Sequence, residues 1–521
     1  MNELLKTSLL WRTVAAIAAW CGRTPVAKAL AALKRCWCDS FLYQSVSRLL
    51  HRKTLAERSH IGGVFDRINA RLSASGYGDY VRSGRAYRVY GALMQKVRES
   101  YLFGKVLSGG FTTILLFLFA AYWPVDYLLR DILQMVTIAS LWDEALFVIS
   151  FIWLAHTRLS ARTPIKNRFS SVDLLLGFYI LVGIVLFAFT RSHVAINITG
   201  FRASMQYLLT FFIVVRLLRD ERDFRMMYNV MILFATAFAI HGIYQYIIGV
   251  PIPSNWTDRA ETEVRTRVFS IFSNPNIMGA YMALFAPLAI GQAYASESAA
   301  RKVLYWFCGL CMCGACLFTM SRGAWLGLAV AAVFFVLIID RRLFLLMLVC
   351  GIAACFLPFV QSRISYLFTT NFQESNNRAG RAKRWSTALK YVDHDNAWAG
   401  GLGYGIYGGA VAVQNKINQN YEYMYVDNYY VKILTENGII GLASLLFSML
   451  GLTWNGFKAI TRAPGRKKPL CVGLLAGLLG MLVQSIFESI WEEPYMMALF
   501  FVIAAMLVFE GFFSEKKETG E

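Results

Sequence analysis

Charged residues are scarce in this chain: Asp, Glu, Lys and Arg make up only 16% of its 521 residues. Soluble globular domains average about 25% charged residues, so this composition disfavours a soluble class. Acidic residues are the rarer kind, with 32 Asp and Glu against 52 Lys and Arg. Hydrophobic residues reach 57% of the chain, and this balance favours an integral membrane protein.

The signs of a disulfide framework or a metal site are also weak. None of the ten cysteines lies between residues 361 and 431. Cys308, Cys311, Cys313 and Cys316 have a spacing that could suit a metal. On a helix their sulfur atoms would diverge, and they lie in an apolar run, so we expect them to pack in a core. No carboxylate cluster suggests a metal site either, and we expect no metal.

Long apolar runs account for most of the chain after residue 110. A bilayer core about 30 Å thick needs roughly 20 apolar residues per helix. The sequence predicts an all-α polytopic protein of about twelve transmembrane helices with one large extracytoplasmic loop at 361–431. The expected spans are 110–128, 134–156, 171–190, 202–218, 226–248, 268–294, 303–319, 324–339, 343–360, 433–454, 470–489 and 494–512.

The basic residues predict the orientation of these spans. Residues 1–108 hold eighteen Lys and Arg against six Asp and Glu, and short basic segments stay in the cytoplasm. An even number of spans then puts both termini inside and the 361–431 loop outside. We attribute the positive charge to topology and lipid headgroups, and expect no nucleic-acid partner.

Three regions follow from this pattern: a basic cytoplasmic extension at 1–108, a membrane domain at 109–513 and a cytoplasmic tail at 514–521. The extension contains helical stretches too short to cross a membrane. We expect it to lie on the inner leaflet as amphipathic helices. A regulatory role, or docking of a cytoplasmic partner, is the alternative.

The first motif that suggests chemistry precedes the sixth span. Arg265 and Arg267 would lie at the outer membrane face, before Asn274, Pro275 and Asn276 at the start of a helix. Guanidinium groups suit phosphate oxygens, and a helix N-terminus offers backbone N–H groups to an anion. Alternatively, the two arginines anchor the helix end at the interface.

Arg322 lies in a tight turn between the seventh and eighth spans, where the chain has little room to leave the membrane. An arginine at that depth is costly unless it has a counter-ion or lines a wet cavity. A functional role in anion binding is one interpretation. A structural pair with Asp143, Glu488 or Glu492 is the other.

Asp427 and Asn428 stand where the outer loop meets the tenth span. We expect a helix from about Asn428, with Glu436 two turns later and Gly438 at a break or close packing contact. A carboxylate at this position could act as a general base towards a hydroxyl. Asp427 could equally be a helix N-cap.

The outer loop itself is rich in aromatic residues and glycine. Arg384 begins a stretch in which Trp385, Leu389 and Val392 follow helical spacing, and this predicts a short amphipathic helix. Aromatic side chains with a polar atom suit sugar faces, and they also suit a membrane-interface belt. The Gly run at 400–405 allows tight turns and close backbone approach.

Taken in order, these motifs resemble the O-antigen ligase and polymerase family of bacterial envelope glycosyltransferases. The resemblance covers roughly residues 110–510. It is carried by RVFSIFSNPNIMGAYMAL (267–284), LFTMSRGAWLGLAVA (317–331), RWSTALKYVDHDNAWAGGLGYGIY (384–407) and VDNYYVKILTENGIIGL (426–442).

The resemblance implies transfer of a glycan from an undecaprenyl-diphosphate carrier to a hydroxyl of a glycan or lipid-glycan acceptor, outside the cytoplasmic membrane. It implies no cofactor, nucleotide sugar or divalent metal. Arg267 and Arg322 match the arginines that hold the diphosphate, and Arg265 assists. Family ligases often carry a His before the final Asn, whereas this chain has Asp427 as the candidate base. The remaining residues expected to shape the site are Asn274, Asn276, Arg384 and Asn428.

Two other functions compete with this interpretation. A flippase or polysaccharide transporter would handle the same lipids, but transporters usually show internal repeats and interrupted helices, neither of which is evident here. A sensor or scaffold would instead act through the basic extension at 1–108.

Overall fold

A computed structural model gives the fold. It describes residues 44, 60–74, 76–99, 110–161, 165, 167–190, 193–251, 266–272, 274–341, 343–370, 373–374, 380–415 and 425–514. The chain divides into two compact units, Met1–Lys53 and Thr54–Glu521. Every regular element in the described part is helical, which confirms the all-α prediction.

The helices before the sixth apolar run are mostly short or interrupted. They are α6 (His60–Ser73), α7 (Tyr77–Ser83), α8 (Arg85–Glu99), α10 (Phe111–Ala120), α11 (Tyr122–Tyr127), the π-helical η1 (Leu128–Ile132), α12 (Val136–Ala139), α13 (Trp142–Leu159), α14 (Ser171–Phe189), α15 (Val194–Met205), the 3₁₀ turn η2 (Gln206–Leu208), α16 (Leu209–Leu217) and α17 (Glu221–Ile248).

The second half carries the longest helix and the segment at 361–431. Its elements are α18 (Pro275–Ala295), α19 (Ala299–Phe318), α20 (Arg322–Ile339), α21 (Leu343–Cys355), α22 (Pro358–Ser365), η3 (Tyr366–Phe368), α24 (Arg381–His394), α25 (Ala410–Asn415), α26 (Tyr429–Arg462), α27 (Lys467–Gln484), η4 (Ile490–Glu492), α28 (Pro494–Val508) and η5 (Phe509–Phe513).

Nine helices of the described part are long and apolar enough to cross a membrane, or ten if one bent pair counts as a span. The predicted twelve spans are therefore not confirmed. The first expected span is the bent pair, in which Phe111–Ala120 and Tyr122–Ile132 meet at 83°. The second is α13, which carries Asp143, Glu144 and Arg158. The ninth is α21, which has only 13 residues.

Side-chain caps explain where several spans begin. Asn274 accepts a hydrogen bond from the Asn276 N–H before Pro275, the first residue of α18. Ser321 caps α20 and Asn428 caps α26 in the same way. Such caps satisfy backbone N–H groups that have no partner within the helix. These caps set the N-terminal ends of α18, α20 and α26.

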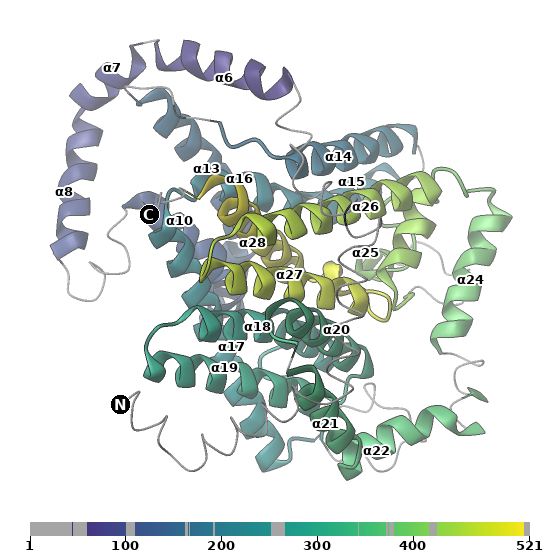
Figure 1. Ribbon diagram of the computed structural model, residues 1–521. Coiled ribbons are helices and arrows are strands. Elements are labelled where there is room, and N and C mark those ends of the chain that lie inside the picture. Colours follow the sequence, from purple (N-terminus) through teal and green to yellow (C-terminus); the bar gives the residue numbers. More distant parts are fainter. Residues whose placement is uncertain are drawn as a thin grey trace, which may run out of the picture. The chain divides into compact units, whose positions relative to one another are not determined.

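α18 is the innermost span, with 89% of its apolar window buried, against 28% for α19 and for α20. It packs on both α19 and α27, and α27 also packs on α20. Glycines allow these close contacts: a Cβ on Gly477 would lie 2.2 Å from the Leu284 carbonyl oxygen. Small residues let membrane helices approach closely. Helices α24 and α8 lie outside these packed helices, on opposite sides in Figure 1.

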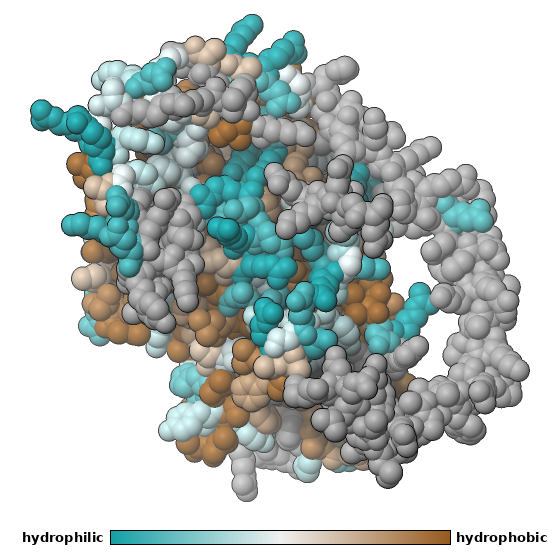
Figure 2. Space-filling view, turned by 60° about the vertical axis from the view of Figure 1, so that its left-hand side comes forward, coloured by the Kyte–Doolittle hydropathy of each residue, from teal (hydrophilic) through white to brown (hydrophobic). Residues whose placement is uncertain are grey.

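The outside of the bundle is apolar over large areas. Figure 2 shows hydrophobic side chains over much of one face, beside a region where polar side chains gather. Residues such as Phe189 (81% exposed) and Ile247 (75% exposed) lie in spans and point outward, as expected of side chains that contact lipid.

Helices α6 and α8 of the basic extension contact α13 and the connector that follows it. The Phe65 ring packs on Phe169, and the Tyr90 ring packs on Trp153. The Asn69 amide donates to the Ile165 carbonyl. The boundary of the basic extension at residue 108, the placement of the extension on the inner leaflet and its role stay predictions. Residues 1–43 and 45–59 lie outside the described part.

Candidate functional site

Three arginines converge on the turn that joins α19 to α20. Arg267, which is 6% exposed, donates from Nε to the Thr319 carbonyl at 3.0 Å. Arg363 of α22 donates from Nε and Nη2 to the Met320 carbonyl at 3.2 and 2.7 Å. Arg322 begins α20 and donates from Nη1 to the Arg363 carbonyl at 3.4 Å. Residues far apart in the sequence therefore bring three guanidinium groups to one turn.

Asn276 joins this turn to the end of α27. Its Oδ1 accepts from Arg267 Nη2 at 2.9 Å, and its Nδ2 donates to Glu488 Oε2 at 2.6 Å. Its backbone carbonyl accepts from Gln484 Nε2 at 2.9 Å. The carboxylate of Glu488 thus fixes the orientation of the Asn276 amide, and that amide in turn positions Arg267.

The amphipathic helix α24 adds two more arginines and confirms the helix predicted there. Arg384 Nη1 and Asp427 Oδ2 form an ion pair at 2.5 Å. Arg381 Nη2 lies 3.9 Å from Glu488 Oε2. Trp385 Nε1 donates to the Val426 carbonyl at 3.0 Å, which holds α24 against the segment before α26.

The whole arrangement is rich in positive charge. It contains five guanidinium groups and two carboxylates. The residues that carry them lie at or just beyond the ends of α18, α20, α22, α24, α26 and α27. We call it the arginine network: Arg267, Arg322, Arg363, Arg381, Arg384, Asp427, Glu488 and the amide of Asn276. Such an excess of fixed guanidinium groups suits a polyanionic ligand such as a diphosphate.

Several expectations about single residues are decided by these contacts. Asn428 rather than Asp427 is the N-cap of α26, since its Oδ1 accepts from the N–H groups of Tyr430 and Val431. Asp427 as a cap is therefore wrong, and its carboxylate instead pairs with Arg384. Arg265 lies outside the described residues.

The structural partners considered for Arg322 have other contacts. Asp143 accepts hydrogen bonds from the hydroxyls of Tyr122 and Tyr207. Glu488 binds Asn276, and Glu492 pairs with Lys432.

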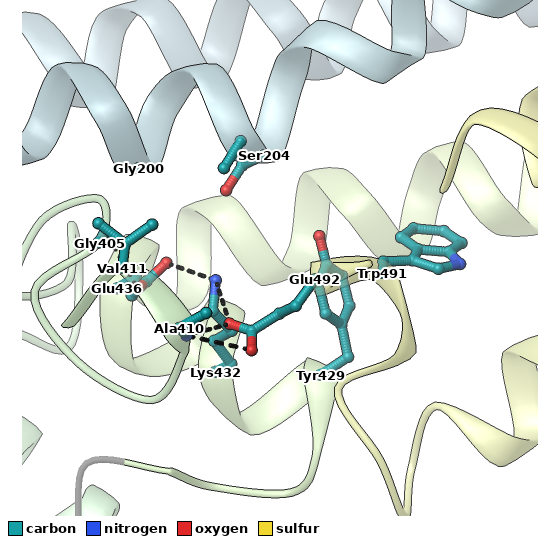
Figure 3. Close-up of a pocket in the computed structure, with 11 residues that line it drawn as sticks. Gly200, Ser204, Gly405, Ala410, Val411, Tyr429, Lys432, Glu436, Trp491 and Glu492 are labelled. Carbon is teal, nitrogen blue, oxygen red and sulfur yellow. Dashed lines mark hydrogen bonds and ion pairs between the residues drawn. The ribbon is translucent and has the colours of Figure 1, made fainter. Parts of the chain in front are cut away.

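A second ionic cluster involves the first two turns of α26 (Figure 3). Lys432 Nζ lies 3.1 Å from Glu436 Oε2 and 3.4 Å from Glu492 Oε1. The Gly405 N–H donates to Glu436 Oε1 at 3.1 Å, and the Ala410 N–H donates to Glu492. We call these three side chains the lysine triad. They line a small pocket of about 40 Å³ together with Gly200, Ser204, Gly405, Ala410, Val411, Tyr429 and Trp491.

The glycine run at 400–405 packs against a break in α26. Gly438 has φ 65° and ψ −170°, a backbone conformation that favours glycine. The Leu402 N–H donates to the Thr435 carbonyl at 2.8 Å, and the Ile439 N–H donates to the Trp398 carbonyl at 2.8 Å. The loop therefore supplies hydrogen-bond partners to backbone groups of α26 at the break. Both expectations for Gly438, a helix break and a close packing contact, are confirmed.

The aromatic residues of the loop divide into two groups. Tyr404, Tyr407 and Tyr429 are at most 3% exposed and belong to the core. Trp398 is 36% exposed. Tyr425 is half-buried, and its hydroxyl donates to Glu492; burial and the surrounding carboxylates raise its pKa well above the ordinary value. Most buried tyrosines of the loop thus serve packing rather than a sugar face or an interface belt.

Sequence reasoning did not assign Arg363, Arg381, Lys432 or Glu488 to a site. A signal for Glu488 was present: it lies with Glu492 in a short connector between two apolar runs, at the end where the loop was expected. Carboxylates in such a position need partners, because a membrane bundle rarely keeps isolated charges. Arg363 and Arg381 carried no such pattern, since they lie in a polar segment.

A family model described as O-antigen ligase matches residues 307–446. The match contains Arg322, Arg384 and Asp427, whereas Arg267, Asn276 and Glu488 lie outside it. It supports an O-antigen ligase-like family, over a narrower stretch than the sequence motifs indicated. With the nine apolar helices it supports a membrane-bound ligase or polymerase role in polysaccharide synthesis. No curated protein matches the chain at a significant level.

Proposed function

We propose that this protein is a glycosyltransferase of the bacterial cytoplasmic membrane, with both termini in the cytoplasm. It moves a glycan from an undecaprenyl-diphosphate carrier to a hydroxyl of a glycan or lipid-glycan acceptor on the outer side. The observation that carries this proposal is the arginine network, in which Arg267 and Arg363 are anchored to the turn that Arg322 follows.

The chemistry of the donor explains why arginines would carry the reaction. When the bond between sugar and diphosphate breaks, negative charge builds up on phosphate oxygens. Guanidinium groups fixed in advance stabilise that charge, without needing to reorganise as the reaction proceeds. Arg267 and Arg322 bind the diphosphate, Arg265 assists them, and Arg363 adds a further cation. Asn274 and Asn276 shape the α18 end of this site, while Arg384 and Asn428 shape the loop side.

The test uses purified protein in detergent with an undecaprenyl-diphosphate-linked oligosaccharide and an acceptor glycan, in the presence of EDTA. We expect wild-type protein to release undecaprenyl diphosphate and lengthen or transfer the glycan. Arg322→Ala should lower the release rate by about 10²–10³-fold, because one transition-state contact is lost. Arg322→Lys should recover only part of it, since a lysine lacks the planar donor fork.

Arg225→Ala is the matched control. Arg225 pairs with Glu221 in the first turn of α17, whereas the site lies near the other end of that helix. This variant should transfer at the wild-type rate. An absence of release by the wild type with every acceptor, together with lipid movement across liposomes, would replace the proposal by transport.

A further inference from the structure

Glu488 is a buried carboxylate that sequence analysis considered only as a structural partner. It lies between α27 and η4, and its side chain is 11% exposed. Its Oε2 accepts the short hydrogen bond from Asn276 Nδ2 at 2.6 Å. The carboxylate is therefore held in one orientation, directly beside the residue that positions Arg267.

The second oxygen of this carboxylate is uncommitted. Among the described residues, no donor lies within hydrogen-bond distance of Glu488 Oε1. Oε1 is also accessible from outside, because it is not one of the fully buried side-chain atoms that lack a hydrogen-bond partner. An anchored carboxylate with one open oxygen has the geometry needed to accept a hydrogen bond from a hydroxyl.

Charged and titratable groups face Glu488 from each neighbouring element. Arg381 comes from α24, Arg267 from the segment before α18, and Asp427 and Tyr425 from the segment before α26. Burial and the negative charge of Asp427 raise the pKa of Glu488 to about 7, against the opposing effects of Arg381, Asn276 and Arg267. A base is most effective when its pKa lies near the working pH.

Asp427 is bound differently. Its Oδ2 forms the 2.5 Å ion pair with Arg384, a direct contact between two charged groups. Glu488 is anchored instead by a neutral amide, and its nearest guanidinium nitrogen is 3.9 Å away. A charge-assisted hydrogen bond of this kind fixes the position of the Arg384 guanidinium group.

We propose that Glu488 accepts the proton of the acceptor hydroxyl, whereas Asp427 positions Arg384. This inference rests on the proposed glycosyl transfer. The acceptor oxygen forms the new bond to the anomeric carbon while its proton passes to Glu488 Oε1. The bond from that carbon to the diphosphate oxygen breaks, and its electron pair leaves with the diphosphate, which the arginine network holds. The proton then passes from Glu488 to water.

The decisive variant is Glu488→Gln, because its amide oxygen can still accept from Asn276 but its side chain cannot take a proton. We expect kcat to fall by about 10²–10⁴-fold with little change in KM for the donor. The wild-type rate should fall about tenfold per pH unit below pH 7, since protonated Glu488 is inactive, and this acidic limb should vanish in the variant. Azide needs no deprotonation, so the variant should form glycosyl azide at a rate near that of the wild type with azide.

Asp395→Asn, an exposed carboxylate beside His394, is the control and should leave rate and pH profile unchanged. Asp427→Asn should keep the acidic limb and raise KM for the donor. The inference is overturned if Glu488→Gln keeps the acidic limb, or if azide fails to rescue it while wild type is active. If the wild type itself releases no undecaprenyl diphosphate, the proposed function fails instead.

Discussion

The two ionic clusters beside the start of α26 use buried charge in opposite ways. In the lysine triad, one ammonium lies between Glu436 and Glu492, and both carboxylates also accept backbone N–H groups of the loop. The arginine network contains five guanidinium groups and two carboxylates, in which Arg384 pairs with Asp427 and Arg381 lies 3.9 Å from Glu488. The comparison teaches that a cluster whose carboxylates are closed by one lysine and by backbone N–H groups holds a loop in place, whereas a cluster rich in guanidinium groups prepares a site for an anionic ligand.

The same segment, Asp427 to Glu436, takes part in both clusters. Asp427 and Asn428 lie on the side of the arginine network, while Lys432 and Glu436 follow on the next turns of α26. The Tyr429 N–H donates to the Ser485 carbonyl at 2.9 Å, and this bond ties the segment to the end of α27. We therefore expect the triad to support the network through the position of this segment.

The largest predicted effect is a loss of folding stability when the lysine triad is disrupted, which disruption of the arginine network should not cause. Lys432→Met should lower the free energy of unfolding by about 3–5 kcal/mol, because it leaves Glu436 and Glu492 buried without their cation. Arg322→Ala should unfold within a few degrees of the wild type although it loses transfer. Thermal unfolding in detergent, followed by tryptophan fluorescence, gives both values.

A compensated variant checks the cause. Lys432→Met combined with Glu436→Gln and Glu492→Gln removes the unpaired charges and should recover most of the lost stability. An Arg322→Ala protein that unfolds as early as Lys432→Met would remove the distinction between a supporting and a ligand-binding cluster.

A smaller effect is expected at the break that carries Glu436. Gly438→Ala should cost about 2 kcal/mol, because alanine is strained at φ 65° and its Cβ would lie 2.2 Å from the Ala399 carbonyl oxygen. Differential scanning of detergent-solubilised protein measures the shift in Tm. Gly177→Ala in α14 is the control, since a Cβ there meets nothing within 4 Å and alanine favours the helix. Equal Tm values for the two variants would show that the loop does not depend on the break.

Much of the fold could be predicted from the sequence, because apolar runs of sufficient length can do little else than form membrane helices. The prediction was least accurate where charge interrupts a run. Asp126 accepts from Trp142 Nε1 at 2.8 Å and pairs with Arg130, so the first run bends instead of continuing. Such polar contacts depend on tertiary packing, which hydropathy alone does not contain.

The site was predictable only in part, for a related reason. Arg267, Arg322 and Asn276 stood out because arginine and asparagine next to apolar runs are unusual, whereas Arg384 stood out as the first residue of the loop motif. The structure brings them into one network. Glu488 and Lys432 derive their roles from neighbours more than 50 residues away or across a helix turn, such as Asn276 and Glu492. Only the Lys432–Glu436 pair follows a local i,i+4 pattern, and no local pattern records the long-range contacts.

The smallest predicted effect lies at the residue that joins the two clusters. Asn428→Ala should cost about 1 kcal/mol, because the N–H groups of Tyr430 and Val431 lose their cap. Asn428→Ser keeps an oxygen that can cap and should recover most of the loss. Thermal unfolding measures the stability, and amide hydrogen exchange at residues 430–432 locates it. If exchange rises at these amides while transfer falls less than tenfold, the cap acts on the helix end alone. A transfer loss as large as that of Arg322→Ala, with unchanged exchange, would instead place Asn428 in contact with the substrate.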